Sequence, residues 1–330
     1  MYRTIIVPLN GSARSERVLP VAVRLAHDSG AALKLVRVFT HHPNGVDERS
    51  LDSLLRASVR DDLAALGDTT SRELGLPVET PLLDGPVVPA LRNFIASHHD
   101  PLVVMATHGR IGVPRVILGS VFDGLVRTGI GPVLALREHN SPDRFASWQR
   151  GTGPFTMIVV PLDGTALAEA GLPHAVSLAT LTGARLHLIR VVAPLMVPSA
   201  LGTGLPMQPL PPLNEAVVTQ QELADDYLQG VVRRIRAVNP GLRLSTETAL
   251  SAAAAGAIVE SCRRHAADLV VMATHGRGAS RVLIRAVADS VIHGGTDAIL
   301  LVRPTNADIP GWMVTPRRGS RSVEPVFAGV

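Results

Sequence analysis

Short apolar runs alternate with longer amphipathic segments along the chain, and this alternation predicts its secondary structure. In the first half we expect five strands, at residues 4–9, 32–39, 79–83, 102–106 and 133–137. Helices are expected between them, at residues 15–29, 48–73, 88–98 and 120–128. Aliphatic strands that alternate with amphipathic helices are typical of βαβ units, and of a parallel sheet that helices cover on both faces.

The second half of the chain repeats the first. Its strands are expected at residues 157–162, 184–192, 243–249, 269–273 and 298–303. The letters Met-Ala-Thr-His-Gly-Arg occupy residues 105–110 and again residues 272–277. A shorter match joins Ile-Val-Pro-Leu-Asn-Gly-Ser, from residue 6, to Val-Val-Pro-Leu-Asp-Gly-Thr, from residue 159. A repeat of this length indicates a duplicated domain. We expect one α/β domain at residues 1–140 and a second at residues 155–303.

Three segments depart from the pattern of strands and helices. Residues 193–213, after the second strand of the second half, are rich in Pro and Gly and predict a long surface loop. Residues 138–154 have the polar composition of a linker. Residues 304–330 carry several prolines and a basic cluster, and we expect this tail to be poorly ordered.

Composition narrows the class of protein. A length of 330 residues suits two domains, and a hydrophobic content of 46% excludes wholesale disorder. The net charge of +4, without a basic stripe, argues against nucleic-acid binding.

The single cysteine, Cys262, excludes an internal disulfide, which suits a reducing compartment. We interpret it as a small core residue. No run reaches the roughly 18 apolar residues of a membrane helix, and no signal sequence is recognisable. We therefore expect a soluble cytoplasmic protein with no membrane partner.

Turn and small residues follow the strands at the edge of the sheet where ligands bind. In open parallel sheets that edge is the carboxyl end of the strands, at the point where the strand order reverses. Asn10 and Gly11 follow the first strand, Gly109 follows the fourth, and Gly119 with Ser120 opens the last helix of the first half. A helix N-terminus presents unpaired N–H groups and a partial positive charge. The arrangement predicts a phosphate-binding site at this helix, with the Ser120 hydroxyl as a cap or a phosphate ligand.

Both halves resemble the universal stress protein family, over residues 2–137 and 156–303. ATP-binding members of that family share the pattern Gly-x2-Gly-x9-Gly-[Ser/Thr] after the fourth strand. The first half has Ala106, Gly109, Gly119 and Ser120 at these positions, with alanine in place of the first glycine. The resemblance implies two flavodoxin-like domains, similar to the adenine nucleotide α-hydrolases, each with a five-stranded parallel sheet and helices on both faces.

The resemblance also implies a function. It implies a stress-response or signalling protein that binds ATP or a related adenine nucleotide, mainly in the first domain. The family places adenine near Val38, and ribose and phosphates near Pro8 and Asn10. The residues implied in this pocket are Pro8, Asn10, Val38, Met105, Ala106, Gly109, Gly119, Ser120 and Val121.

Two departures from the family pattern bear on the ligand. Asn10 stands where the family usually has aspartate, so the charge that would hold a divalent ion is missing and a need for Mg²⁺ with ATP is not expected. In the second half Asp163, Val191 and Gly276 match the pattern, but Ala286 and Val287 replace the later Gly-Ser. The second site is expected to bind more weakly or not at all.

Motifs for fast chemistry are missing from the sequence. The only lysine, Lys34, lies within a predicted strand, which excludes a Walker P-loop, and no GxGxxG follows the first strand. His108 and His275 recur beside the predicted phosphate loops and are interpreted as structural residues. We assign no catalytic residue and no metal ligand, and expect at most a slow ATPase. The alternatives are a protein-interaction module with empty pockets and a slow hydrolase or nucleotidyltransferase of related fold.

The last strands of the two halves, residues 133–137 and 298–303, are similar and would each leave an open sheet edge. In the family that this chain resembles, such strands form dimers. We expect them to pair antiparallel, either within one chain as a pseudo-dimer or between two chains.

Overall fold

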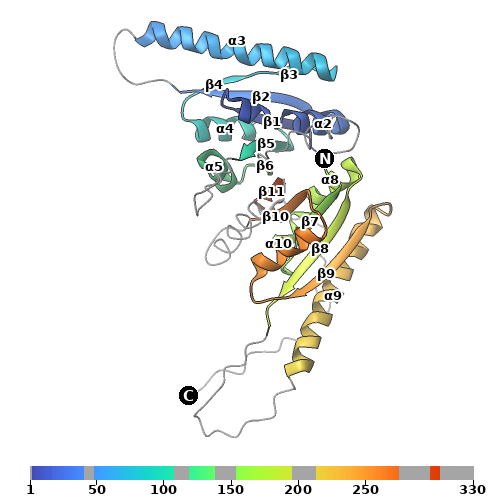
Figure 1. Cartoon of the computed structure of the whole chain (residues 1–330). Helices are drawn as coiled ribbons and strands as arrows, with labels where there is room; N and C mark the ends of the chain where they lie inside the picture. Colours follow the sequence, from blue (N-terminus) through green and yellow to red (C-terminus); the bar gives the residue numbers. More distant parts are fainter. Residues whose placement is uncertain are drawn as a thin grey trace, which may run out of the picture.

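The computed structural model describes residues 2–40, 48–107, 119–137, 154–194, 213–274 and 298–304, and these form one large sheet with helices packed against it (Figure 1). The strand order is β3-β2-β1-β5-β6-β11-β10-β7-β8-β9, with β4 also beside β2. The strands of the first half are β1 (Thr4–Leu9), β2 (Ala32–Phe39), β3 (Val78–Glu79), β4 (Leu82–Asp84), β5 (Pro101–Thr107) and β6 (Val133–Arg137). Those of the second half are β7 (Met157–Pro161), β8 (Arg185–Val192), β9 (Leu244–Leu250), β10 (Leu269–Ala273) and β11 (Ala298–Val302).

Helices connect the strands in both halves. The first half contains α1 (Ala13–Glu16), α2 (Leu19–Ser29), α3 (Glu48–Leu74), α4 (Val87–Ala96) and α5 (Ser120–Thr128). The second half contains α7 (Ala166–Glu169), α8 (Leu172–Thr182), α9 (Leu213–Val238) and α10 (Ala254–Arg264). Within each half all described strand pairs are parallel. The prediction of two α/β halves with parallel sheets is confirmed.

Two predicted elements are divided in the structure, and a proline lies at each division. The strand expected at 79–83 is split into β3 and β4, which both pair with β2. Pro81 lies between them and cannot donate to the ladder, although its carbonyl oxygen accepts from the Arg37 amide at 3.2 Å. The helix expected at 15–29 is split into α1 and α2, with Pro20 in the first turn of α2, where proline is favoured.

The two halves join through β6 and β11, which pair antiparallel within the one chain. The register places Leu134 opposite Leu300 and Leu136 opposite Ala298. Of the two pairings considered from the sequence, the structure shows the internal one. The pairing leaves neither strand as an open edge, so the six described strands of the first half and the five of the second form one eleven-stranded sheet.

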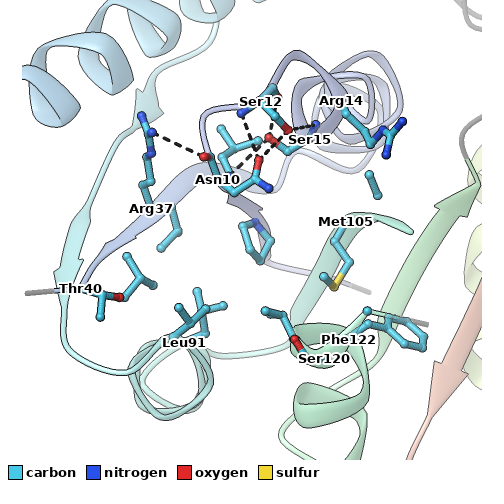
Figure 2. A pocket seen from close by; sticks show the side chains of 18 of the residues that line it. Asn10, Ser12, Arg14, Ser15, Arg37, Thr40, Leu91, Met105, Ser120 and Phe122 are labelled. Carbon is cyan, nitrogen blue, oxygen red and sulfur yellow. Dashed lines mark hydrogen bonds between the residues drawn. The ribbon is translucent and has the colours of Figure 1, made fainter. Parts of the chain in front are cut away.

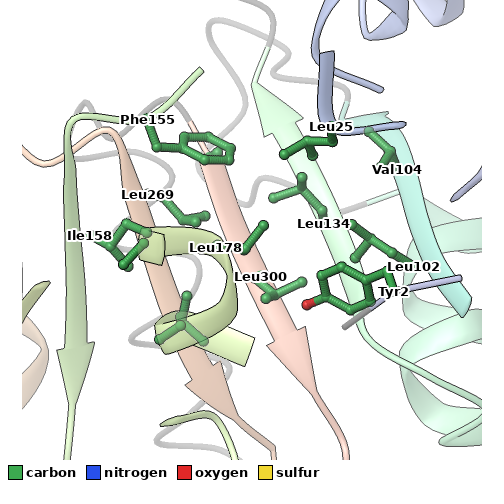
Figure 3. Close-up of a cluster of buried hydrophobic side chains, with 14 of the residues drawn as sticks. Tyr2, Leu25, Leu102, Val104, Leu134, Phe155, Ile158, Leu178, Leu269 and Leu300 are labelled. Carbon is green, nitrogen blue, oxygen red and sulfur yellow. The ribbon is translucent and has the colours of Figure 1, made fainter. Parts of the chain in front are cut away.

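Apolar side chains fill the space on both sides of this junction. One core cluster includes residues of both halves, among them Leu25, Leu134, Phe155, Leu178 and Leu300 (Figure 3). Tyr2, from the start of the first half, stacks on His174 of α8, and its hydroxyl lies 3.0 Å from the histidine Nδ1. Cys262 is buried, as predicted. The halves therefore share a continuous core.

The segments expected to be loops fall largely outside the described residues. These are the linker beyond Arg137, residues 195–212 of the insert, and the tail from residue 305. Helix α9 begins at Leu213, where the predicted insert ends. Within the described ranges, no helix combines the length and apolar character needed to cross a membrane.

Leu134 and Leu300 face each other across the junction and both are fully buried. Replacing either by alanine is expected to lower the free energy of unfolding by about 2–5 kcal/mol, because each change leaves a cavity. The double variant should lose less than the sum, with a coupling of about 0.5–3 kcal/mol, because the two side chains share one contact. Urea unfolding of the four proteins measures this cycle. Strictly additive losses would show that the leucines do not touch.

Candidate functional site

A cavity of about 330 Å³ opens at the carboxyl ends of β1, β2 and β5 in the first half. β1 lies between β2 and β5 in the sheet, so the connections from β1 and from β5 leave in opposite directions and open a crevice there. Helices α1, α4 and α5 contribute the remaining walls, together with Val59 of α3. The volume lies within the range of small-molecule pockets, which is about 300–1,000 Å³.

The structure brings together the site residues predicted for the first half wherever it describes them. They all line this cavity: Pro8, Asn10, Val38, Met105, Ala106, Gly119, Ser120 and Val121. Gly109 lies outside the described residues. Residues that are distant in the sequence meet here because parallel strands end at one edge of the sheet.

The inner wall of the cavity is apolar. Val36, Leu91, Met105 and Phe122 are buried beneath it, and Val38 packs against the same core cluster. Figure 2 shows Leu91, Met105 and Phe122 on one side, and the polar turn after β1 on the other. A flat aromatic group would lose water against this wall without burying a polar protein group.

The turn after β1 is held by the side chain of Asn10. Its Oδ1 accepts from the Ser12 amide at 3.0 Å and from the Ser12 hydroxyl at 2.7 Å (Figure 2). Ser12 Oγ in turn accepts from the Ser15 amide at 3.2 Å and caps α1. Because the oxygen of Asn10 is committed to the turn, the other branch of this amide, an NH₂ group, is a hydrogen-bond donor.

Gly11 allows an arginine to lie directly over this turn. Its φ of 76° belongs to the left-handed region, and an added Cβ would lie only 2.0 Å from Arg37 Nη2. Arg37 Nη2 also lies 3.5 Å from the Asn10 carbonyl oxygen. No other residue type fits at position 11 without moving the arginine.

The N-terminus of α5 forms another wall of the cavity. Gly119 is the N-cap, with φ −32° and ψ 148°, and makes no side-chain cap hydrogen bond. Of the two roles considered for Ser120, the structure does not show the cap, since Ser120 is the first residue of the helix and is exposed. The first N–H groups of a helix have no partner inside the helix, so this end attracts an anion.

Arg14 and Arg37 line the cavity and were not found by sequence reasoning. Among the described lining residues these two are the charged ones, and both are positive. Arg37 directly precedes Val38 in β2, which was the available signal. Its position over Gly11 depends on the left-handed turn and cannot be read from spacing. The cavity therefore combines an apolar wall with a positively charged rim.

The second half builds the same turn from Asp163. Its Oδ1 accepts from the Thr165 amide at 2.8 Å and from the Thr165 hydroxyl at 2.6 Å. Arg190 lies over Gly164 as Arg37 lies over Gly11. Val191, the next residue of β8, is at the position of Val38 and packs against the core. Gly276 and the Ala286-Val287 pair lie outside the described residues, so their predicted roles stay predictions.

The fold and the cavity define a duplicated, doubly wound α/β protein with a ligand-sized pocket at the strand-order reversal of its first half. The model of the Universal stress protein family matches residues 1–137 and 154–303. The chain belongs to this family, as the sequence resemblance indicated.

Relatives and solved structures agree with this membership. A universal stress protein of Mycolicibacterium smegmatis is 25% identical over 313 residues, which cover 91% of this chain and 97% of the relative. One from Mycobacterium tuberculosis is 27% identical over 236 residues, which cover 69% of this chain and 67% of the relative. The crystal structure of a universal stress protein from Archaeoglobus fulgidus is similar with a TM-score of 0.62. Its identity is 15%, and the match covers 93% of this chain and 99% of that one. The last match shows a shared fold.

Asn10→Ala removes the acceptor that holds the turn after β1. The free energy of unfolding should fall by about 1 kcal/mol, the usual net contribution of such a hydrogen bond. Asn10→Asp keeps the acceptor, as Asp163 does in the second half, and should leave stability close to that of the unmodified protein. Urea unfolding measures both variants. Equal stability of the alanine variant and the unmodified protein would mean that the turn does not depend on Asn10.

Proposed function

We propose that this protein binds ATP or a related adenine nucleotide in the cavity of its first half and acts in a stress response or in signalling. The observation that carries the proposal is the convergence of the described first-half site residues on one cavity beside the α5 N-terminus. We take the binding domain to be residues 1–140 and its repeat to be residues 155–303.

The cavity suits the separate parts of a nucleotide. Adenine would lie against the apolar wall near Val38, at the carboxyl end of β2. The phosphates would lie between the turn after β1 and the N–H groups that begin α5. Arg14 and Arg37 would add positive charge at the rim. Guanidinium groups match phosphate oxygens well because they present paired donors.

Hydrolysis is expected to be slow. The described residues that line the cavity include no Asp, Glu, His or Lys that could activate a water molecule. The NH₂ group of Asn10 faces phosphate without repulsion, and no carboxylate is available at this position to hold Mg²⁺. Because asparagine replaces aspartate at position 10, we expect the nucleotide to bind without a divalent ion.

The second half is proposed to bind nucleotide more weakly. Its turn carries the negative charge of Asp163 at the position of Asn10, and a carboxylate repels phosphate unless a cation lies between them. The loss of the Gly-Ser pair at residues 286 and 287 would add to this difference.

Gly119→Glu tests the site directly. The change places bulk and negative charge at the α5 N-terminus, and a glutamate in the first turn does not oppose helix formation. ATP affinity, measured by calorimetric titration, should fall at least about a hundredfold, since like charges in contact cost several kcal/mol. The matched control is Gly241→Glu, at a position with open space around it. Retained affinity in the Gly119 variant would remove the proposed site.

Asn10→Asp separates the roles of charge and turn. It preserves the turn but places a carboxylate beside the phosphates. Affinity for ATP without divalent ions should fall roughly tenfold, which corresponds to ~1.4 kcal/mol. Addition of Mg²⁺ should restore most of it. Equal affinities for both proteins in the presence of a chelator would show that position 10 does not face phosphate.

A second candidate function is a protein-interaction module. Helix α3 exposes the large apolar side chains of Leu51, Leu54 and Leu55, with exposed fractions of 54%, 68% and 44%. Their spacing of three and four residues places them on one face of the helix, where they form a small apolar surface. Absence of nucleotide binding at millimolar concentration would favour this function over the first.

A further inference from the structure

A cluster of metal-ligating side chains lies under α10 in the second half, apart from the turn that corresponds to the proposed nucleotide site. His187 comes from the middle of β8, Glu247 from β9, and His265 from the end of α10. One ligand atom from each of these residues lies within 4.8 Å of the other two. The His187 side chain is 2% exposed, and those of Glu247 and His265 are 16% and 33% exposed.

Both imidazoles approach the same carboxylate oxygen. His187 Nε2 lies 3.2 Å from Glu247 Oε2, and His265 Nε2 lies 3.4 Å from it. Around a tetrahedral zinc ion, with bonds of about 2.0–2.1 Å, neighbouring ligand atoms are about 3.3 Å apart. The two imidazole–carboxylate distances match this spacing.

We propose that His187, Glu247 and His265 bind a divalent transition-metal ion of the Zn²⁺ class. Two imidazoles and one carboxylate are a ligand set that zinc accepts. Because His265 is partly exposed, an ion can enter from its side and take a fourth ligand from solvent. The ion would connect the end of α10 to two neighbouring strands, β8 and β9.

Neighbouring groups orient the ligands as a metal site requires. Ser245 Oγ lies 2.8 Å from His187 Nδ1, so that nitrogen can carry the proton and leave Nε2 for the ion. Arg264 donates to Glu247 Oε1 at 2.7 Å and leaves Oε2 turned toward the imidazoles. The Arg264 side chain is 53% exposed, so solvent screens its charge. Such supporting contacts usually hold metal ligands in place.

The carboxylate oxygen Oε2 of Glu247 is the atom on which the cluster converges. Ser261 Oγ donates to Glu247 Oε2 at 2.7 Å, in addition to the approach of the two imidazoles. The contacts from Ser261 and His187 are hydrogen bonds and match the two lone pairs of this oxygen, whereas His265 Nε2 approaches it at 3.4 Å as an ion pair only. A metal ion between the imidazoles and the carboxylate would replace the two imidazole contacts with bonds of regular geometry.

The first half lacks this ligand set and supplies a control. His98 and His265 each precede the repeated Met-Ala-Thr by seven residues, so they occupy corresponding positions. His98 Nδ1 lies 2.7 Å from the Phe94 carbonyl oxygen instead of near a carboxylate. The residue of β2 that corresponds to His187 is Lys34, which forms an ion pair with Glu79. The site therefore belongs to the second half.

Titration of the untagged full-length chain, stripped of metal with a chelator, tests the proposal. Zn²⁺ is added in competition with a chromophoric chelator, and Co²⁺ is added separately for its visible spectrum. One tight Zn²⁺ per chain and the intense absorption of tetrahedral Co²⁺ are expected. His265→Ala should abolish the Co²⁺ bands and lower Zn²⁺ affinity more than a hundredfold. Ser245→Ala should lower it by about 10–100-fold, as loss of a supporting contact does.

His98→Ala is the matched control and should bind Zn²⁺ as the unmodified chain does. His265 is partly exposed, so its variant should fold, and circular dichroism checks this. Glu247→Gln offers a second test, since it keeps the size of the side chain and removes its charge. Unchanged Zn²⁺ affinity in the folded His265→Ala and Glu247→Gln proteins would overturn the proposal. Failure of the unmodified chain to bind Zn²⁺ at micromolar concentration would do the same. Neither result bears on the nucleotide site, because the residues changed in these variants do not line the cavity of the first half.

Discussion

The position of β1 between β2 and β5 is the constraint on which the proposed ligand site depends. It makes the chain leave neighbouring strands in opposite directions, which opens a crevice at the carboxyl ends of β1 and β5. The turn after β1 and the start of α5 then face each other across a cavity. Neither the apolar wall nor the helix N-terminus would form a site alone, and the strand order is what places them together.

Duplication has given one scaffold two different sets of side chains. The halves repeat the turn after the first strand, down to the arginine that lies over its glycine. They differ where charge matters, with Asn10 in one and Asp163 in the other. They differ again beneath α10, where the second half has His187, Glu247 and His265, a ligand set that the described part of the first half lacks beneath α4. The antiparallel junction of β6 and β11 and the shared core join both halves into one sheet and one core.

Much of the fold could be predicted from the sequence, because apolar runs and the internal repeat are local signals. The bounds of β1, β2 and β6 agree with prediction residue for residue. The divisions at Pro81 and Pro20 were missed because the flanking apolar patterns continue through both prolines. The pocket residues of β1, β2 and β5 could be predicted because parallel strands end together and because the family pattern names them.

Side-chain placement across long sequence distances could not be predicted. Arg37 reaches the pocket because of the left-handed turn at Gly11, which spacing does not reveal. His187, Glu247 and His265 are separated by up to 78 residues, and they meet only through the register of β8 with β9 and the packing of α10. His265 carries no motif that distinguishes it from His98. The helix at residues 120–128 was predicted with its observed bounds, but the structure places Gly119 and not Ser120 at the N-cap.

The central claim is that backbone N–H groups at the start of α5 bind the phosphates of an adenine nucleotide. The most direct measurement is a nuclear magnetic resonance titration that follows the backbone amide signals of Gly119, Ser120 and Val121 as ATP is added. The account predicts large, saturable shifts of these three signals and smaller ones elsewhere in the chain. Signals that stay in place while ATP reaches millimolar concentration would contradict it.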